Sequence, residues 1–193
     1  PATQEDPELA STTLDKPANA AATNPHGTLC VDAWNGFNEV SRKAMLWTAR
    51  HLWPSGAGFA FNCCCHSATL IVRRGGDSAC SVLLSREGVT QGDPLAMVLY
   101  GLTLVPLAKF LHEAMPLVCQ PWYTNDKAMS GKVSAIADTM RLLQTHGPSR
   151  GYFLEPSKSI LICNPENRLA AKSVLQEFDF KYSDGEWYIG GFI

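Results

Sequence analysis

The sequence predicts an α+β domain in which helices cover one face of an antiparallel sheet. Short apolar runs alternate with longer segments whose apolar residues recur at helical spacing. Three pairs of such runs flank polar or glycine-containing turns, which is typical of β-hairpins. With 193 residues, of which 46% are hydrophobic and 18% charged, the chain has enough apolar material for one core.

The first half of the chain predicts a strand, a helix, a hairpin and a second helix after an extended or disordered lead-in. In order these are the lead-in 1–27, a strand over 28–31, a helix ending before Pro54, hairpin strands at 59–73 and 79–86, and a helix beginning at Asp93-Pro94. The spacing of Val40, Ala44 and Trp47 supports the first helix and places Trp47 in the core. In the helix that begins at Asp93-Pro94 the predicted buried stripe is Leu95, Val98, Leu99, Leu102 and Val105.

The second half predicts a hairpin, a helix, a strand, a helix and a final hairpin. In order these are strands around a turn at Thr124–Lys127, a helix capped by Ser134 and stopped by Gly147-Pro148, a strand over 159–163, a helix opened by Asn164-Pro165, and a hairpin over 181–193 that turns at Asp184-Gly185. Together with the first half, these elements make up one folded domain over 28–193.

Charge and cysteine content narrow the class of protein. The formal net charge is −2, and residues 1–25 carry −3 of it, which leaves +1 for the rest of the chain. A nearly neutral body argues against a general nucleic-acid coat but leaves room for a locally basic groove. The seven cysteines have no regular spacing and the chain shows no signal peptide, which favours an intracellular protein, cytoplasmic or nuclear. The uncharged stretch over 94–108 is too short to span a bilayer, so no membrane partner is expected.

Two aspartates are candidates for metal binding because each lies at the mouth of a predicted strand. Asp32 directly follows the first strand, and Asp126 lies in the turn of the second hairpin. Taken alone, Asp32 also suits a helix cap and Asp126 an ordinary turn. Together in one sheet, the two carboxylates suit Mg²⁺, which binds one or two carboxylates alongside phosphate oxygens.

Other polar and aromatic residues have both a functional and a structural interpretation. Cys63-Cys64-Cys65-His66 contains zinc-ligand residue types, but consecutive strand residues point to opposite faces, so a half-buried strand is the favoured interpretation. Arg73 and Arg74 near a hairpin tip suit template phosphates or simply a charged turn. Trp34 is the better tryptophan for contacting substrate, since Trp47 is assigned to the core.

Five segments occur in the order of the palm motifs of reverse transcriptases. They are Asp32-Ala-Trp-Asn-Gly-Phe-Asn38, Arg86-Glu-Gly-Val-Thr-Gln-Gly-Asp-Pro-Leu95, Tyr123-Thr-Asn-Asp126, Pro156-Ser-Lys-Ser159 and Tyr188-Ile-Gly-Gly-Phe192. The chain most resembles the retrotransposon-encoded, non-LTR-like group. The resemblance implies a polymerase palm with part of the fingers and no thumb, acting on an RNA or DNA template-primer and dNTPs with Mg²⁺ or Mn²⁺.

The resemblance also implies a role for individual residues. Asp32 matches the first metal-binding aspartate, with the carbonyl of Ala33 beside it, and Phe37 matches the aromatic gate that selects deoxynucleotides. Gln91 and Gly92 match the loop that lines the nucleotide pocket, and Lys158 matches the lysine that neutralises or protonates pyrophosphate. Two further groups complete the match: Tyr123 to Asp126 as the carboxylate turn, and Gly190 and Gly191 in the primer grip. Arg73 and Arg74 are candidates for template contact from their charge alone, and a charged turn is the favoured interpretation.

The chain departs from the family pattern at the carboxylate turn, where Asn125 precedes Asp126. An asparagine oxygen can still contact a metal ion, but the lost negative charge is expected to lower the rate by orders of magnitude. The sequence therefore predicts an RNA-directed DNA polymerase domain with weak or no activity. The alternative is a non-catalytic nucleic-acid-binding or scaffold domain derived from a reverse transcriptase, and the oligomeric state is not predicted.

Overall fold

A five-stranded sheet, in the order β4-β5-β1-β6-β7, forms the centre of the protein. The computed structural model describes residues 24–73, 80–123, 126–188 and 191–192. The strands of the sheet are β1 (His26–Val31), β4 (Trp122–Tyr123), β5 (Asp126–Lys132), β6 (Ile160–Ile162) and β7 (Lys181–Ser183). The central strand β1 pairs antiparallel with both β5 and β6, whereas β6 and β7 are parallel.

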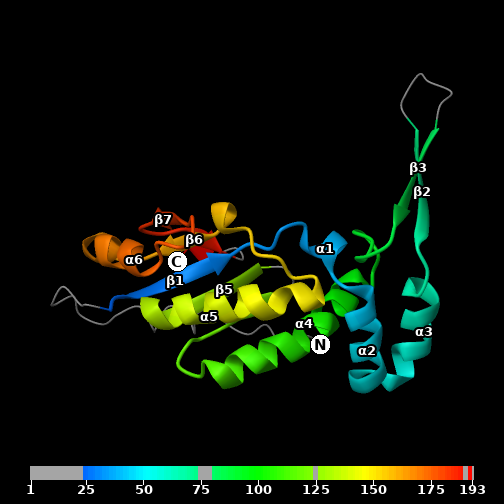
Figure 1. Cartoon of the computed structure of the whole chain (residues 1–193), viewed down its shortest axis with the longest axis horizontal. Helices are drawn as coiled ribbons and strands as arrows, with labels where there is room; N and C mark the ends of the chain where they lie inside the picture. Colours follow the sequence, from blue (N-terminus) through cyan, green and yellow to red (C-terminus); the bar gives the residue numbers. More distant parts are fainter. Residues whose placement is uncertain (1–23, 74–79, 124–125, 189–190, 193) are drawn as a thin grey trace.

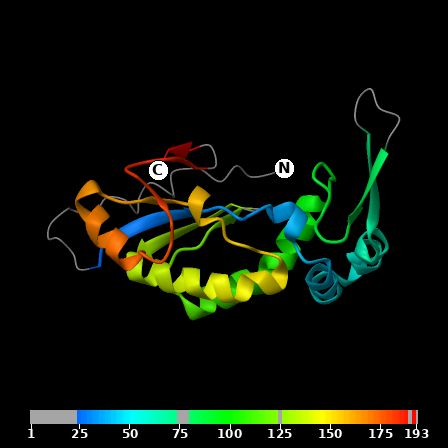
Figure 2. The ribbon, with the colours of Figure 1, turned by 45° about the horizontal axis from the view of Figure 1, so that its top comes forward.

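Two long helices cover one face of this sheet, as Figure 2 shows. They are α4 (Ala96–Ala114) and α5 (Val133–His146), and the short helix α6 (Arg168–Val174) packs against α5. Leu29 and Val31 of β1 lie directly opposite Met129 and Lys127 of β5, and all four side chains are buried. The α+β class, with helices on one face of a mainly antiparallel sheet, is therefore confirmed.

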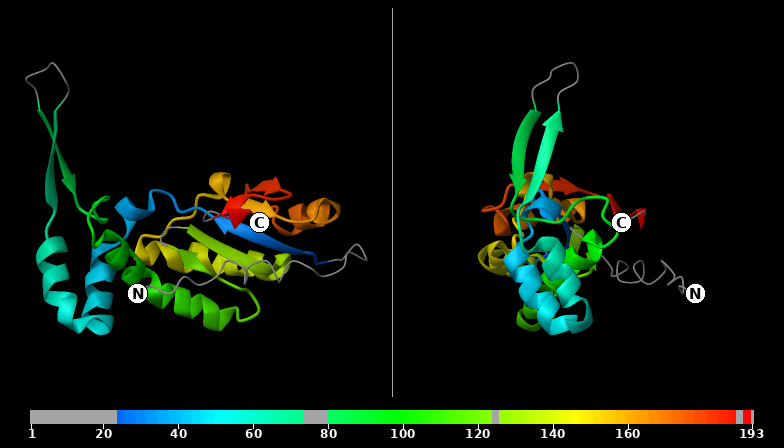
Figure 3. Two further views of the ribbon diagram at one scale, coloured as in Figure 1. Left: turned by 180° about the vertical axis from the view of Figure 1, so that it is seen from behind. Right: turned by 90° about the vertical axis from the view of Figure 1, so that its right-hand side faces the viewer.

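A second group of elements extends beyond one end of the sheet (Figures 1 and 3). It contains α1 (Gly36–Glu39), α2 (Arg42–Leu52), α3 (Pro54–Cys64) and a two-stranded ribbon of β2 (Ala68–Arg73) and β3 (Cys80–Ser85). The Arg42 side chain fixes the base of this ribbon, because it donates hydrogen bonds to the carbonyl oxygens of His66, Ser85 and Gly88 and to Ser85 Oγ. Beyond that base the ribbon projects away from the sheet.

The remaining described elements are short. They are the 3₁₀ turns η2 (Gly147–Arg150), η3 (Pro156–Lys158) and η4 (Pro165–Asn167), and the hairpin of β8 (Trp187–Tyr188) and β9 (Gly191–Phe192).

The prediction of a strand from residue 59 is wrong, because residues 54–64 form α3. Pro54 occupies the first helical turn, where its missing N–H costs nothing. Gly56 and Ala60, four residues apart, are the buried positions of this helix, while the two phenylalanines between and after them are exposed. Cys63 and Cys64 consequently lie in the last turn of a helix and not on a half-buried strand.

Two predictions about core helices are also wrong in detail. Trp47 is 55% exposed, because α2 buries Met45, Thr48 and Ala49 and so turns Trp47 outward. In α4, Val98 of the predicted stripe is half exposed. The buried positions of α4 are instead Ala96, Leu99, Tyr100, Thr103, Leu104, Leu107 and Leu111.

Two predictions in the second half of the chain need similar corrections. Asp184-Gly185 does not close a hairpin, because β7 leaves β8 and joins β6 in parallel. The helix α5 begins at Val133, and the Ser134 N–H donates to the side-chain oxygen of Asn24, so a residue that precedes β1 supplies the cap.

Candidate active site

Asp32 and Asp126 lie at adjoining strand ends on the open face of the sheet. Asp32 follows the end of β1, Asp126 opens β5, and the pairing of Val31 with Lys127 places the next two positions opposite each other. Burial raises the pKa of the Asp126 carboxyl, and the nearby negative charge of Asp32 raises it further. A carboxyl whose ionisation is disfavoured by burial and by a neighbouring carboxylate forms a site that a cation would stabilise.

The backbone of Asp32 is held in place by the segment that leads into β6. The Asp32 N–H donates to Ser159 Oγ at 3.1 Å, and the Glu155 N–H donates to the Asp32 carbonyl at 3.0 Å. Ser159 is fully buried and its hydroxyl also donates to the Glu155 carbonyl. Asp32 is therefore fixed on both sides by one short segment, and the following Ala33 is buried and bridged to Leu154.

The same segment presents a lysine to the carboxylates. Lys158 ends η3, and its Nζ lies 4.0 Å from Asp32 Oδ2. The Lys158 side chain is 63% exposed, so this ion pair contributes little to stability. The ammonium group is free to turn toward an anionic ligand at the site.

An aromatic pair at the edge of the core lies near this site. Phe37 follows α1's first residue and stacks on Tyr100 of α4 with ring centroids 4.8 Å apart. Tyr100 is fully buried, and its hydroxyl has no hydrogen-bond partner among the described residues. Burial raises the pKa of Tyr100, and the charges of Asp126 and Asp32 add to the effect, so the hydroxyl keeps its proton beside the carboxylates.

The loop before α4 is attached beside Phe37. The Val89 N–H donates to the Phe37 carbonyl at 2.7 Å, and the turn that follows is closed by a hydrogen bond from the Asp93 N–H to the Thr90 carbonyl. Within this turn Gln91 is exposed, and Gly92 has a φ of 90°, a left-handed conformation that favours glycine. Val89 thus attaches this loop to Phe37, and the nucleotide-contacting role of Gln91 and Gly92 stays a prediction.

The other predicted residues are distributed over the molecule. Tyr123 is half exposed and pairs with Asp126 across the β4–β5 turn, whereas Arg73 lies at the distal end of the ribbon, well separated from the carboxylates (Figure 1). Gly191 pairs with Tyr188 in the β8–β9 hairpin. Arg74, Asn125 and Gly190 lie outside the described residues.

The residues of the site suit a divalent metal ion of the Mg²⁺ type. Asp32 and Asp126 offer hard oxygen ligands, and their mutual repulsion gives a reason for a cation to bind. Among the described residues there is no group of three or more histidine, cysteine, aspartate or glutamate side chains that could hold a metal ion. Among the described residues, Asp32 and Asp126 are the carboxylates that could hold a cation at this site.

Sequence reasoning missed the residues that support the site. Local patterns assigned no role to Arg42, Tyr100 or Lys127, because their contacts form only when the chain folds. Lys127 is fully buried next to Asp126, with its Nζ 4.1 Å from the centroid of the Trp122 ring and 3.2 Å from Gln120 Oε1. A lysine between Asp126 and the apolar Ala128-Met129 run was the available signal.

The sheet order and the two covering helices match a reverse-transcriptase-like palm fold. Comparison with solved structures supports this class. The chain matches apo telomerase from Candida tropicalis truncated from its C-terminal domain, with a TM-score of 0.59 and 13% identity over 87% of this chain and 34% of that one. It also matches telomerase from Candida albicans in complex with the TWJ fragment of telomeric RNA, with a TM-score of 0.55 and 12% identity over 74% of this chain and 28% of that one.

The chain thus spans about a third of the length of these telomerase chains. No protein-family model and no curated protein matches it. Within the described part of the chain, no helix is long and apolar enough to cross a membrane.

Proposed function

We propose that the chain is a reverse-transcriptase domain of the retrotransposon-encoded, non-LTR-like type, which adds deoxynucleotides to a primer on an RNA or DNA template. The observation that carries this proposal is the convergence of Asp32, Asp126 and Lys158 at one end of the sheet. The reverse-transcriptase-like palm fold supports it, because the sequence motifs that carry Asp32, Asp126 and Lys158 resemble those of reverse transcriptases.

Each residue contributes a defined role to the proposed reaction. Asp32 and Asp126 would hold Mg²⁺ or Mn²⁺, which supplies charge stabilisation for the attacking oxygen and the triphosphate. Lys158 is exposed and close to Asp32, so it can neutralise or protonate the leaving pyrophosphate. Phe37, held in place by Tyr100, would exclude a 2′-hydroxyl.

A second candidate function is a non-catalytic nucleic-acid-binding or scaffold domain with the same fold. The replacement of a carboxylate by Asn125 favours it, because one negative charge is missing from the metal site. All seven cysteines are free thiols, which suits either function in a reducing compartment such as the cytoplasm or nucleus.

Primer extension separates the two functions. The assay uses an RNA template with a DNA primer and dNTPs, in Mg²⁺ and separately in Mn²⁺. For a polymerase we expect extension that Asp32→Ala abolishes and that Asn125→Asp increases by about tenfold or more. Asp179→Ala, which removes an exposed carboxylate between α6 and β7, is the matched control.

The outcome assigns the function. No extension in either metal by the folded wild-type chain and by Asn125→Asp would contradict the catalytic proposal and leave the binding domain. Thermal unfolding in the presence and absence of Mn²⁺ gives an independent measure of metal binding, since a ligand that binds the folded state raises Tm.

A further inference from the structure

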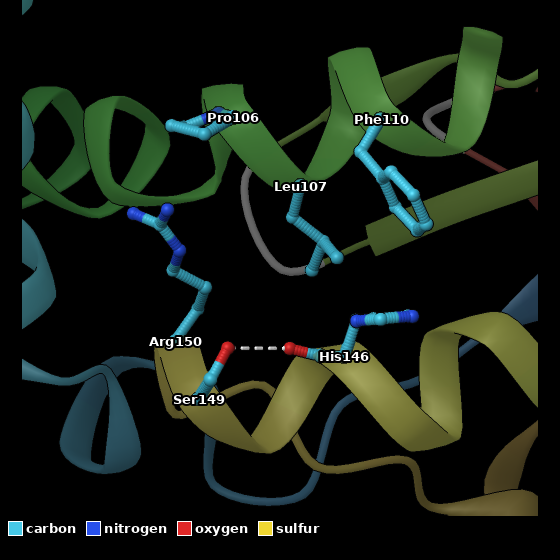
Figure 4. Close-up of a pocket in the computed structure, with 6 residues that line it drawn as sticks. All are labelled: Pro106, Leu107, Phe110, His146, Ser149 and Arg150. Carbon is cyan, nitrogen blue, oxygen red and sulfur yellow. Dashed lines mark hydrogen bonds between the residues drawn. The ribbon is translucent and has the colours of Figure 1, made fainter. Parts of the chain in front are cut away.

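A small pocket opens between the helices on the side of the sheet opposite the carboxylates (Figure 4). Its volume is about 140 Å³. The side chains that line it come from α4, from the end of α5 and from η2, and they are Pro106, Leu107, Phe110, His146, Ser149 and Arg150. The pocket is independent of the candidate active site, because the sheet lies between the two.

The polar side of the pocket is cationic. Its lining includes a guanidinium and an imidazole and no acidic side chain. Arg150 donates to the neutral Thr48 Oγ1 at 3.0 Å and has no ion pair among the described residues. By contrast, Arg141 on the same side of the protein is paired with both Asp138 and Glu177. The charge of Arg150 is therefore available to an anionic ligand.

An aromatic contact orients His146, the other nitrogen-bearing side chain of the pocket. The His146 ring meets Phe110 edge-on, with centroids 4.6 Å apart, and Figure 4 shows the two rings next to each other at one end of the pocket. Ser149 Oγ donates to the His146 carbonyl, which ties η2 to the end of α5. The pocket thus combines an apolar wall on α4 with nitrogen donors on the opposite side.

An exposed tryptophan adjoins the pocket. The Arg150 guanidinium lies 5.8 Å from the centroid of Trp47, and His51 stacks on the same indole at 4.2 Å. Trp47 is 55% exposed, although the helical pattern of α2 had placed it in the core. The helix α2 also carries Arg42, Lys43 and Arg50 and no acidic residue.

We propose that this pocket and Trp47 form a second contact site for a single-stranded nucleic acid, in which a backbone phosphate binds Arg150 and His146 and a neighbouring base packs on Trp47. Interleaved basic and aromatic side chains are the usual means of binding single strands without sequence preference. The proposal rests on the proposed function insofar as that function requires a nucleic-acid ligand. It places an extra contact on the helical side of the sheet, away from the site of chemistry.

Fluorescence anisotropy with a labelled 15-nucleotide single strand of uridines tests the proposal. Arg150→Gln and Trp47→Ala are each expected to raise Kd by about fivefold or more. Arg150→Gln is also expected to reduce the slope of log K against log salt by about 0.7, the value for one phosphate contact to a single strand. Arg141→Gln is the matched control and should leave both quantities unchanged, because its charge is already neutralised by two carboxylates.

Two further measurements keep the test decisive. His146→Gln changes an exposed residue and carries the test if Arg150→Gln fails to fold. Inorganic phosphate is expected to shift the His146 ring signals in an NMR titration and to compete with the oligonucleotide. Phosphate binding without any change of oligonucleotide affinity in the variants would identify a site for free anions only and would overturn the proposal.

The proposal and the proposed function can fail separately. Equal affinities for Arg150→Gln, Arg141→Gln and the wild type would overturn the second contact site, whatever the result of primer extension. An oligonucleotide that does not bind the wild type at all would overturn it too. Loss of oligonucleotide affinity in Arg150→Gln, in a chain that extends no primer, would retain the contact site and remove only the polymerase.

Discussion

The buried Lys127 is expected to make the stability of the protein depend on pH. Its side chain is fully buried, and this burial lowers the pKa of Lys127 from 10.5 to about 7. Its amine donates a hydrogen bond to Gln120 Oε1, and the Trp122 ring lies beneath it. Between pH 7 and 10.5 the unfolded state therefore binds more protons than the folded state, so the free energy of unfolding rises with pH.

The size of the effect follows from the two pKa values. At pH 7 the unfolded chain holds the Lys127 proton almost fully and the folded chain holds about half of it, and by pH 9 the folded chain has lost it. At about 1.4 kcal/mol for each pH unit and each proton, Lys127 contributes about 2 kcal/mol of added stability between pH 7 and pH 9.

Lys127→Met tests this reasoning because methionine fills a similar volume without a charge. The variant is expected to be more stable than the wild type at pH 7 by about 1–2 kcal/mol, after the loss of the amine's contacts with Gln120 and Trp122 is counted. Its stability should lack the increase of about 2 kcal/mol between pH 7 and pH 9.

The assay is urea denaturation at pH 7, 8 and 9 in a reducing buffer with EDTA, which keeps metal ions away from the neighbouring Asp126. Lys132→Met is the matched control, since Lys132 is an exposed lysine at the other end of β5. The difference between wild type and variant removes the contributions of all other titratable groups. A pH dependence that is the same in wild type and Lys127→Met would refute the assignment to this amine.

Three other substitutions test the supports of the site. Arg42→Ala removes four side-chain hydrogen bonds at the base of the ribbon and should lower the local stability of the ribbon by about 2–3 kcal/mol. Amide hydrogen exchange should therefore become faster in β2 and β3 but not in the five-stranded sheet. Unchanged exchange would contradict the anchoring role of Arg42. Gly151 has a φ of 74°, and a Cβ at this position would collide with the Glu39 carbonyl. Gly151→Ala should therefore lower the free energy of unfolding by about 3 kcal/mol or more. Gly92→Ala, at a position with open space around it, should lower it by about 1 kcal/mol. Tyr100→Phe removes a buried hydroxyl that has no partner among the described residues and should raise stability by about 1 kcal/mol in calorimetry, so a loss of stability would point to a partner for that hydroxyl.

Local sequence patterns were sufficient to predict the helices and strands whose apolar residues keep one regular spacing along their length. The strand before Asp32, the helices α2, α4 and α5, the β4–β5 hairpin and β6 all occur where alternating or helical apolar spacing predicts them. Asn164 caps the next helical turn as expected, with its side chain accepting from the Glu166 N–H.

The errors arise where a tertiary contact decides between two local possibilities. The apolar run Phe59-Ala-Phe61 fits a strand by composition, but Gly56 and Ala60 let α3 pack closely on α2 and so select the helix. β7 fits a hairpin with β8, but pairing with β6 completes the buried sheet, and the Lys181 N–H donates to the Ser159 carbonyl there.

In the candidate site, too, local patterns predict the positions of residues, whereas tertiary contacts determine their properties. The positions of Asp32, Asp126 and Lys158 are predictable, because strand ends and a short turn determine them and the order of the segments is readable along the chain. What the sequence does not reveal is the environment that gives these groups their properties. The pKa of the Asp126 carboxyl depends on Asp32, which is distant in the chain, and on burial that only the folded sheet creates. Whether two carboxylates are sufficient for catalysis beside Asn125 is thus a question about the charge balance of the folded site, and restoring the third carboxylate with Asn125→Asp addresses that balance directly.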